Sequence, residues 1–197
     1  MRNKQFTSEN AVLLLIDHQV GTMGWVRSSS LEEIKMNTVA LAKAAKAVNM
    51  PLVLTSSMED QPQGPLFEEL AQAAPEAFAA RVQRAGIVDC MQDTNFSAAV
   101  QKTGRKNMIM AGLTTDVCVV YPAISALQEG YAVQVVVDAC GSPTKTADDI
   151  ALRRMEIAGV TLTTTNQLIA ELAQDWSSAN GQKLIGILFQ EILSKQS

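Results

Sequence analysis

Histidine is almost absent from this chain, and its scarcity excludes several kinds of catalytic site. His18 is the single histidine among 197 residues. A Ser-His-Asp triad or a Cys-His dyad would have to use it, and a metal site with two or three imidazole ligands is impossible within one chain. If the protein uses a side-chain nucleophile, we therefore expect its general base to be a carboxylate.

Cysteine is also scarce, with three residues at scattered positions: Cys90, Cys118 and Cys140. No CxxC pair occurs, so neither a disulfide framework nor a zinc ribbon is indicated. Cys90 and Cys140 stand in no helix-start context, and we interpret both as bystanders.

Long apolar runs, phosphate-binding motifs and a strong charge bias are missing as well. No apolar stretch approaches the roughly 20 residues of a membrane-spanning helix, and the polar N-terminus lacks the apolar core of a signal peptide. Neither GxGxxG nor GxxxxGK followed by Ser or Thr is present, so the nucleotide-binding α/β folds have no support. The net charge of −4 and the pI near 5.0 argue against a nucleic-acid or anionic-membrane partner. We expect a cytoplasmic protein with a small-molecule substrate.

Apolar runs alternate with helical patterns along most of the chain. Strands are predicted at 11–16, 52–54, 79–82, 107–111, 133–137 and 160–164, and helices at 31–48, 66–73, 96–103, 118–127, 148–158 and 167–175. Such alternation is typical of βαβ units, which build a mostly parallel sheet covered by helices on both faces. We therefore expect an α/β protein with one domain at 1–180 and a helical extension at 181–197. The apolar stripe of the extension favours an oligomer contact, although it also fits packing onto its own domain.

Chemically active side chains gather at the predicted carboxyl ends of the strands. Asp17 follows the first strand, Ser56 and Ser57 end the second, 112–118 follows the strand at 107–111, and Asp138 follows the next. In open parallel sheets, ligands bind at this edge. The sequence thus brings a thiol, two carboxylates and several hydroxyl groups to one rim.

Cys118 is the strongest candidate nucleophile because it falls in the first turn of a predicted helix. Unpaired N–H groups and the positive end of the helix dipole favour the thiolate there, and the thiolate is the reactive form. A buried and inert structural cysteine is the alternative, and position alone does not separate the two.

Asp17 and Arg84 are the groups that would serve such a nucleophile. Asp17 ends an almost wholly apolar strand, where a carboxylate is costly unless it is paired or functional; a strand-end cap is the alternative. Near Cys118, an ionised Asp17 would disfavour a free thiolate, would accept the proton as the sulfur attacks, and would need a nearby cation. Arg84 is the candidate cation, with an ordinary surface arginine as the alternative. We interpret Asp138 as structural and expect His18 to point away from the site.

The segment 112–119, Gly-Leu-Thr-Thr-Asp-Val-Cys-Val, is similar to the nucleophile segment of the isochorismatase-like hydrolases. With Leu-Leu-Ile-Asp-His-Gln at 14–19 and the residues that follow Cys118, the resemblance covers most of residues 11–175. The Asp-His-Gln opening and the segments 64–66 and 84–86 look most like the YcaC-type branch. That branch contains hydrolases of unknown substrate that often form octamers, so the resemblance implies a homo-oligomer, either a tetramer or an octamer.

The resemblance further implies a three-layer α/β/α sandwich and a Cys-Asp-Lys triad that attacks an amide or a related carbonyl. By position, Cys118 would be the nucleophile and Asp17 the base. The family also implies a non-proline cis peptide between Leu113 and Thr114. The amides of Thr114 and Cys118 would then form an oxyanion hole.

Two departures from the family pattern bear on the mechanism. No lysine occurs between Lys46 and Lys102, so the triad lysine is missing and Arg84 is the nearest substitute. An arginine supplies charge but does not readily donate its proton, so proton transfer would fall to Asp17 alone. A single histidine cannot build the metal site of the nicotinamidase branch, and the presence of Cys118 counts against the branch that cleaves isochorismate.

Two functional hypotheses follow. The first is a cysteine-dependent hydrolase of a small amide or carbamoyl-type compound, which acts on C–N bonds other than peptide bonds through a thioester intermediate. It would need no metal or organic cofactor, and Trp25, Ser57, Asp89 and Tyr121 would line its pocket beside Arg84. The second is a non-catalytic small-molecule binder or thiol sensor on the same scaffold, which the missing lysine supports.

Overall fold

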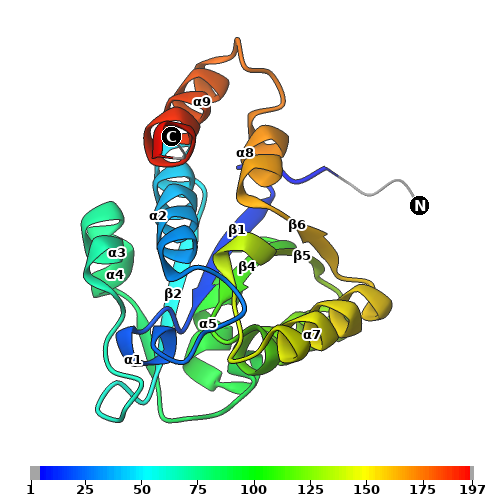
Figure 1. Cartoon of the computed structure of the whole chain (residues 1–197). Coiled ribbons are helices and arrows are strands. Elements are labelled where there is room, and N and C mark those ends of the chain that lie inside the picture. The colour runs from blue at the N-terminus through cyan, green and yellow to red at the C-terminus, as the bar shows by residue number, and fades with distance from the viewer. Residues whose placement is uncertain (1–4, 196–197) are drawn as a thin grey trace.

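A six-stranded, all-parallel sheet forms the centre of the computed structural model, which describes residues 5–195 (Figure 1). Its strands are β1 (Ala11–Ile16), β2 (Leu52–Ser57), β3 (Val82–Arg84), β4 (Asn107–Gly112), β5 (Ala132–Val136) and β6 (Thr161–Thr163). Their order in the sheet is β3-β2-β1-β4-β5-β6. The chain therefore builds outward from β1 in one direction and from β4 in the other, and ligand sites of such sheets lie at this switch point.

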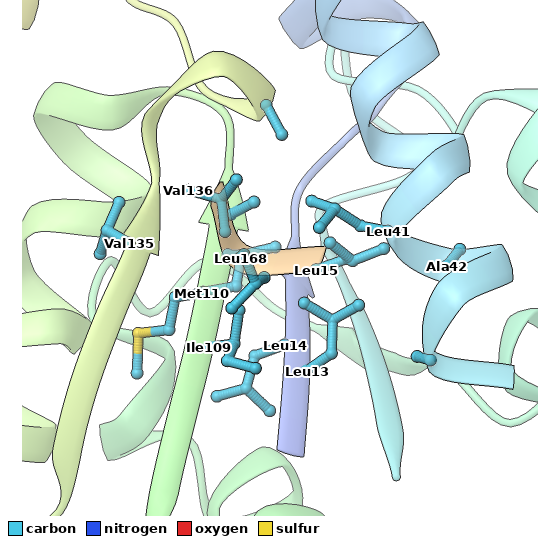
Figure 2. Close-up of a cluster of buried hydrophobic side chains, with 14 of the residues drawn as sticks. Leu13, Leu14, Leu15, Leu41, Ala42, Ile109, Met110, Val135, Val136 and Leu168 are labelled. Atoms are coloured by element: carbon cyan, nitrogen blue, oxygen red, sulfur yellow. The ribbon is translucent and has the colours of Figure 1, made fainter. Parts of the chain in front are cut away.

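The strands β1 and β4 occupy the middle of the sheet and are buried along their whole lengths. Every side chain of β1 is apolar, as expected for a strand that is covered on both faces. A Cβ atom at Gly112 would lie 2.5 Å from the carbonyl oxygen of Ile16, so the close approach of the two strand ends requires glycine. Figure 2 shows the resulting core, to which β1, β4, β5 and a flanking helix contribute, among others, Leu14, Leu15, Leu41, Ile109 and Val136.

Helices cover both faces of the sheet, in the three-layer α/β/α arrangement predicted from the sequence. On one face α2, α3, α8 and α9 pack together, and on the other α6 packs against α7 (Figure 1). The α-helices are α1 (Val20–Met23), α2 (Leu31–Ala47), α3 (Glu68–Ala73), α4 (Pro75–Ala79), α5 (Thr94–Lys102), α6 (Val120–Gln128), α7 (Lys145–Ala158), α8 (Thr165–Ala173) and α9 (Ala179–Glu191). Short 3₁₀ turns span Cys90–Gln92, Val137–Ala139 and Leu193–Lys195, and a π-helical turn spans Thr115–Val119.

Most predicted elements are confirmed, and three local predictions need correction. The strand predicted at 79–82 is wrong except at its last residue, because Pro75 opens the short helix α4 and the edge strand runs over Val82–Arg84. The four-residue helix α1 was not predicted. The helix predicted to open at Cys118 is preceded by the π-helical turn, so that α6 itself begins at Val120.

The C-terminal helix α9 packs onto the rest of the chain. It begins at Ala179, so the predicted boundary after residue 180 falls inside it, while residues 1–4 and 196–197 of the two predicted segments lie outside the described residues. Leu184 and Leu188 are buried where α9 packs against α2 and α8. Phe189 and Leu193 stay exposed, and the expected oligomer contact remains a prediction for these two side chains. No helix within residues 5–195 combines the length and the apolar character needed to cross a membrane.

Candidate active site

Asp17, Arg84 and Cys118 come together at the carboxyl ends of three strands. Asp17 follows β1, Arg84 ends β3, and Cys118 lies shortly after β4. All three line one cavity of about 310 Å³. Thr114 and two of the four predicted pocket residues, Trp25 and Ser57, line the same cavity.

The other two predicted pocket residues, Asp89 and Tyr121, lie outside this cavity and line a neighbouring one. The carboxylate of Asp89 has a structural role: it accepts hydrogen bonds from the N–H of Met91 at 3.0 Å and from the hydroxyl of Ser125. The ring of Tyr121 faces the guanidinium of Arg154 at 5.1 Å. The prediction that Asp89 and Tyr121 line the pocket is therefore corrected.

A larger cavity, of about 480 Å³, lies beside the start of β2. Its lining includes Lys46, Pro51 and Glu76 but no cysteine, serine or threonine. The smaller cavity, which brings a thiol beside a buried ion pair, is therefore the candidate active site.

The carboxylate of Asp17 is held by Arg84 in a buried ion pair. One terminal nitrogen of Arg84, Nη2, lies 2.5 Å from each carboxylate oxygen. The other guanidinium nitrogens are also engaged: Nε donates to Thr55 Oγ1 at 2.9 Å and Nη1 to the Ile87 carbonyl at 2.7 Å. Arg84 is only 4% exposed, which excludes the interpretation as an ordinary surface arginine. The planar, fully hydrogen-bonded guanidinium of Arg84 therefore fixes the position of the Asp17 carboxylate.

The backbone at Asp17 turns out of β1 through a left-handed conformation, with φ of 55°. Aspartate tolerates this region better than most residues. Burial raises the pKa of Asp17, and the charge and hydrogen bonds of Arg84 oppose this rise. A carboxylate whose pKa is raised while it stays paired with a permanent cation is suited to accept a proton.

The environment of Cys118 favours the thiol over the thiolate, as expected for a cysteine beside an ionised Asp17 and contrary to the effect of a helix start alone. Burial raises the pKa of Cys118, and the charge of Asp17 together with the hydrogen bond between the two side chains raises it further. The N–H of Thr114 and the charge of Arg84 act in the opposite direction but do not prevail. The cysteine also lies within a π-helical turn, where its own N–H donates to the Thr114 carbonyl at 2.8 Å and so is not one of the unpaired N–H groups of a helix start.

The peptide bond between Leu113 and Thr114 is cis, as the resemblance implied. The carbonyl of Thr114 accepts the N–H groups of Val117 at 3.2 Å and of Cys118 at 2.8 Å. The Cys118 amide is thus engaged within the protein, whereas the Thr114 amide lies close enough to the Cys118 sulfur to favour its thiolate. An oxyanion hole built from these two amides stays a prediction, and it requires the Cys118 N–H to be shared with the Thr114 carbonyl.

Two further titratable residues have structural partners. Asp138 accepts the N–H and the hydroxyl of Thr165 at the start of α8, at 2.9 and 2.8 Å, in line with the structural role predicted for it. His18 lies away from the cavity, with Nε2 2.9 Å from the carbonyl oxygen of Ala139. Burial lowers the pKa of His18 to about 4, so the imidazole is neutral at physiological pH.

Cys90 and Cys140 are fully buried and do not line the cavity, which agrees with their interpretation as bystanders. Burial raises the pKa of Cys140 to about 12. Across residues 5–195, no three His, Cys, Asp or Glu side chains gather in a way that could hold a metal ion.

Several cavity residues escaped the sequence interpretation, among them Gln19, Thr22 and Asp116. The side chain of Gln19 is completely buried and ties two loops together: it donates to the carbonyls of Ser57 and Gly64 at 2.8 and 2.5 Å and accepts the N–H of Ser57 at 2.9 Å. These residues stand in the same strand-end segments as Asp17 and Cys118. Nothing in the sequence, however, tells which neighbours of a catalytic residue face the cavity.

Comparison with known proteins agrees with the resemblance. The isochorismatase domain model matches residues 11–167. The probable hydrolase YcaC of Escherichia coli is 39% identical over 167 residues, which make up 85% of this chain and 79% of that protein. The crystal structure of E. coli YcaC, described as an octameric hydrolase of unknown specificity, matches with a TM-score of 0.93 at 35% identity and covers 100% of this chain and 95% of that one. YcaC from Pseudomonas aeruginosa, solved with hexane-2,5-diol and covalent acrylamide, matches with a TM-score of 0.92 at 38% identity over 98% of this chain and 94% of that one. The chain therefore belongs to the isochorismatase family of hydrolases and, within it, to the YcaC-type branch.

Proposed function

We propose that this protein hydrolyses a small amide or carbamoyl-type compound through a covalent thioester formed at Cys118. The observation that carries the proposal is the juxtaposition of a thiol with a buried, arginine-held carboxylate at one cavity. The hydrogen bond between Asp17 and Cys118 provides the path for the proton that the sulfur must lose.

In the first half of the reaction, the sulfur of Cys118 attacks the carbonyl carbon while its proton passes to Asp17. The C–N bond then breaks, and the proton on Asp17 moves to the leaving nitrogen, so that ammonia or an amine departs. In the second half, Asp17 takes a proton from water, and the resulting hydroxide attacks the thioester carbon. The C–S bond breaks, the acid is released, and the proton returns to the sulfur.

Arg84 orients the base and stabilises its charge but does not itself transfer a proton. Its guanidinium remains charged throughout the pH range in which proteins fold, so it cannot replace a lysine as a proton donor. Its hydrogen bonds to Thr55 and Ile87 fix the guanidinium, and the two from Nη2 hold the carboxylate in one place during both halves of the reaction.

Two features of the relatives support the proposal. The P. aeruginosa YcaC structure contains covalent acrylamide, an electrophile of the kind that thiols attack, and we infer that Cys118 is the corresponding reactive group here.

E. coli YcaC is octameric, and we propose that the present protein is also a homo-oligomer. Native mass spectrometry tests the second point, and a monomer at micromolar concentration would contradict it.

The hydrolase proposal predicts that Cys118→Ala loses amide turnover by on the order of 10³-fold or more, while its unfolding midpoint stays close to that of the parent. The assay follows ammonia release from a panel of short primary amides and carbamoyl compounds. Cys90→Ala is the matched control, because it also removes a buried thiol but one that does not line the cavity. Retention of full activity by Cys118→Ala would rule out the covalent mechanism.

The non-catalytic alternative makes the opposite prediction. A binder or thiol sensor would give no ammonia from any member of the panel and no acyl adduct on Cys118 in intact-mass spectra. Exposed thiols of low pKa are the first to be oxidised. Since burial and Asp17 raise the pKa of Cys118, the sensor function has less support than hydrolysis.

A further inference from the structure

The lining of the cavity around Cys118 carries two acidic side chains and one basic side chain. Among the described residues that line it, the charged side chains are Asp17, Arg84 and Asp116. Asp17 and Arg84 neutralise each other, and each guanidinium nitrogen of Arg84 already donates a hydrogen bond within the protein. No ion pair or side-chain hydrogen bond engages Asp116 within the described part of the chain, and its Oδ1 is buried without a partner. The charge that remains available to a ligand is therefore negative.

A second unpartnered oxygen belongs to Thr22. This residue of α1 is 4% exposed, lines the same cavity, and has a hydroxyl without a hydrogen-bond partner among the described residues. A helical threonine can bond the carbonyl four residues earlier. Here that carbonyl, of His18, accepts the N–H of Phe67 at 3.1 Å. A buried hydroxyl left unpaired is destabilising, and its position on a cavity indicates that a ligand supplies the partner.

The rest of the described cavity lining offers no further charged side chain. Gln19 uses both ends of its amide to hold the surrounding loops. Ser57, Gln63 and Thr114 are uncharged polar residues on the lining. The remaining walls are apolar, with Trp25, Met58, Ile87, Val88, Val117 and Pro143. An indole such as that of Trp25 also favours a cation over an anion.

We propose that this cavity selects short amides that carry an ammonium group and rejects those that carry a carboxylate, with Asp116 and Thr22 accepting hydrogen bonds from the ammonium. This substrate class rests on the proposed function, since it assumes that the reacting carbonyl lies at Cys118. A substrate carboxylate would face Asp116 with no free cation to offset the repulsion. A cavity of about 310 Å³ is at the lower end for small-molecule sites, which fits an amide with a short aliphatic chain.

The first test measures charge preference without any turnover. The parent protein is treated with aminoethyl, methyl and sulfonatoethyl methanethiosulfonates, which are cationic, neutral and anionic. In each case the sulfur of Cys118 forms a mixed disulfide, methanesulfinate leaves, and the thiol proton goes to the buffer. Rates at Cys118 are determined by mass spectrometry and divided by the rates with free 2-mercaptoethanol. We expect the cationic reagent to exceed the anionic one by roughly tenfold or more.

The variant Asp116→Asn decides whether Asp116 is the cause. We expect its ratio of cationic to anionic labelling to fall to near that of the free thiol, while its unfolding midpoint confirms that it is folded. Glu129→Gln is the matched control: it removes the same charge at the exposed far end of α6 and should keep the parent's ratio. An unchanged ratio in Asp116→Asn, or faster labelling by the anion in the parent, would overturn the proposal.

The second test uses three amides of similar length: 4-aminobutanamide, pentanamide and succinamate. For the parent we expect kcat/KM to decrease in that order. In Asp116→Asn and in Thr22→Val, the differences in kcat/KM between the three amides should become smaller. Thr22→Val should also raise the unfolding midpoint, because it removes an unpaired buried hydroxyl at constant shape. If none of the three is hydrolysed, the proposed function fails, while the labelling ratios still decide the charge preference; if all three are hydrolysed equally, the charge preference fails alone.

Discussion

At the scale of single residues, the charge of Asp17 has two opposing effects on Cys118. It raises the pKa of the cysteine, after burial the largest cause of that rise, and so keeps the proton on sulfur. The same carboxylate is the acceptor for that proton when an amide is attacked. Reactivity toward a simple alkylating agent and reactivity toward an amide should therefore respond differently to the loss of this charge.

The variant Asp17→Asn tests this separation. Without the negative charge and beside an unpaired Arg84, the pKa of Cys118 falls, and we expect alkylation by iodoacetamide at pH 7 to accelerate by on the order of tenfold. Amide turnover should instead fall by about 100-fold or more, because the base is gone. Mass spectrometry at Cys118 and ammonia release measure the two rates.

Asp89→Asn is the control for this experiment, since Asp89 is a nearby buried carboxylate that lies outside the cavity. It should leave both rates close to those of the parent. A parallel fall of alkylation and turnover in Asp17→Asn would show that Asp17 activates the thiol in advance, contrary to the structure.

At the scale of elements, local pattern predicted the fold well where one physical cause dominates. The run 11–16 is apolar throughout because β1 is covered on both faces, and α2 begins where the Ser30 hydroxyl caps the N–H of Glu33. Prediction failed at 79–81, where Pro75 at the helix start and the alanines that follow favour the helix α4 over a strand. It failed again at the π-helical turn before α6, which no residue type marks.

The candidate site likewise contains residues that the sequence could predict and residues that it could not. Asp17, Cys118 and Arg84 were predictable because strand ends and the family resemblance point to them. Tyr121 and Asp89 were placed wrongly because their side chains, although close in sequence to the site, face the neighbouring cavity. Side-chain direction on a loop or after an irregular turn depends on contacts that the sequence does not display.

The helix α9 provides a prediction at this scale. Leu184 is fully buried where α9 packs on the domain, so Leu184→Ala should lower the free energy of unfolding by about 2–5 kcal/mol. Phe189 on the same helix is 57% exposed, so Phe189→Ser should change the stability by less than about 0.5 kcal/mol in a monomer. Urea unfolding measures both.

Sedimentation of the same two variants separates packing from assembly. A shift of Phe189→Ser toward smaller species would show that the exposed face of α9 contacts another subunit. If Leu184→Ala were as stable as the parent, α9 would not belong to the domain core.

At the scale of the whole molecule, His18 couples stability to mild acid. Its pKa is lowered from an ordinary 6.5 to about 4 by complete burial. Between pH 6.5 and pH 4, His18 binds a proton in the unfolded chain but stays neutral in the folded protein. Its contribution to stability is therefore present above pH 6.5 and is lost as the pH falls toward 4. The difference corresponds to roughly 3 kcal/mol.

We therefore expect the parent to lose more stability than His18→Gln between pH 6.5 and pH 4, by an amount approaching that figure. Glutamine keeps a donor for the Ala139 carbonyl but does not titrate. Buried carboxyls such as Asp17 and Asp138 titrate in both proteins, so the difference between the two curves of unfolding free energy against pH isolates the imidazole. Parallel curves would mean that His18 is protonated in the fold.

The engaged guanidinium of Arg84 also limits which residues can replace it in this protein. A lysine in its place, as in the family's usual triad, presents a single nitrogen that cannot reach the Asp17 carboxylate, Thr55 Oγ1 and the Ile87 carbonyl from the positions that the fork occupies. The exchange would leave the Ile87 carbonyl without this donor, and the Thr55 hydroxyl would keep only its hydrogen bond to the Val82 carbonyl. We therefore expect Arg84→Lys to be tolerated only if Thr55 and the loop after β3 change with it.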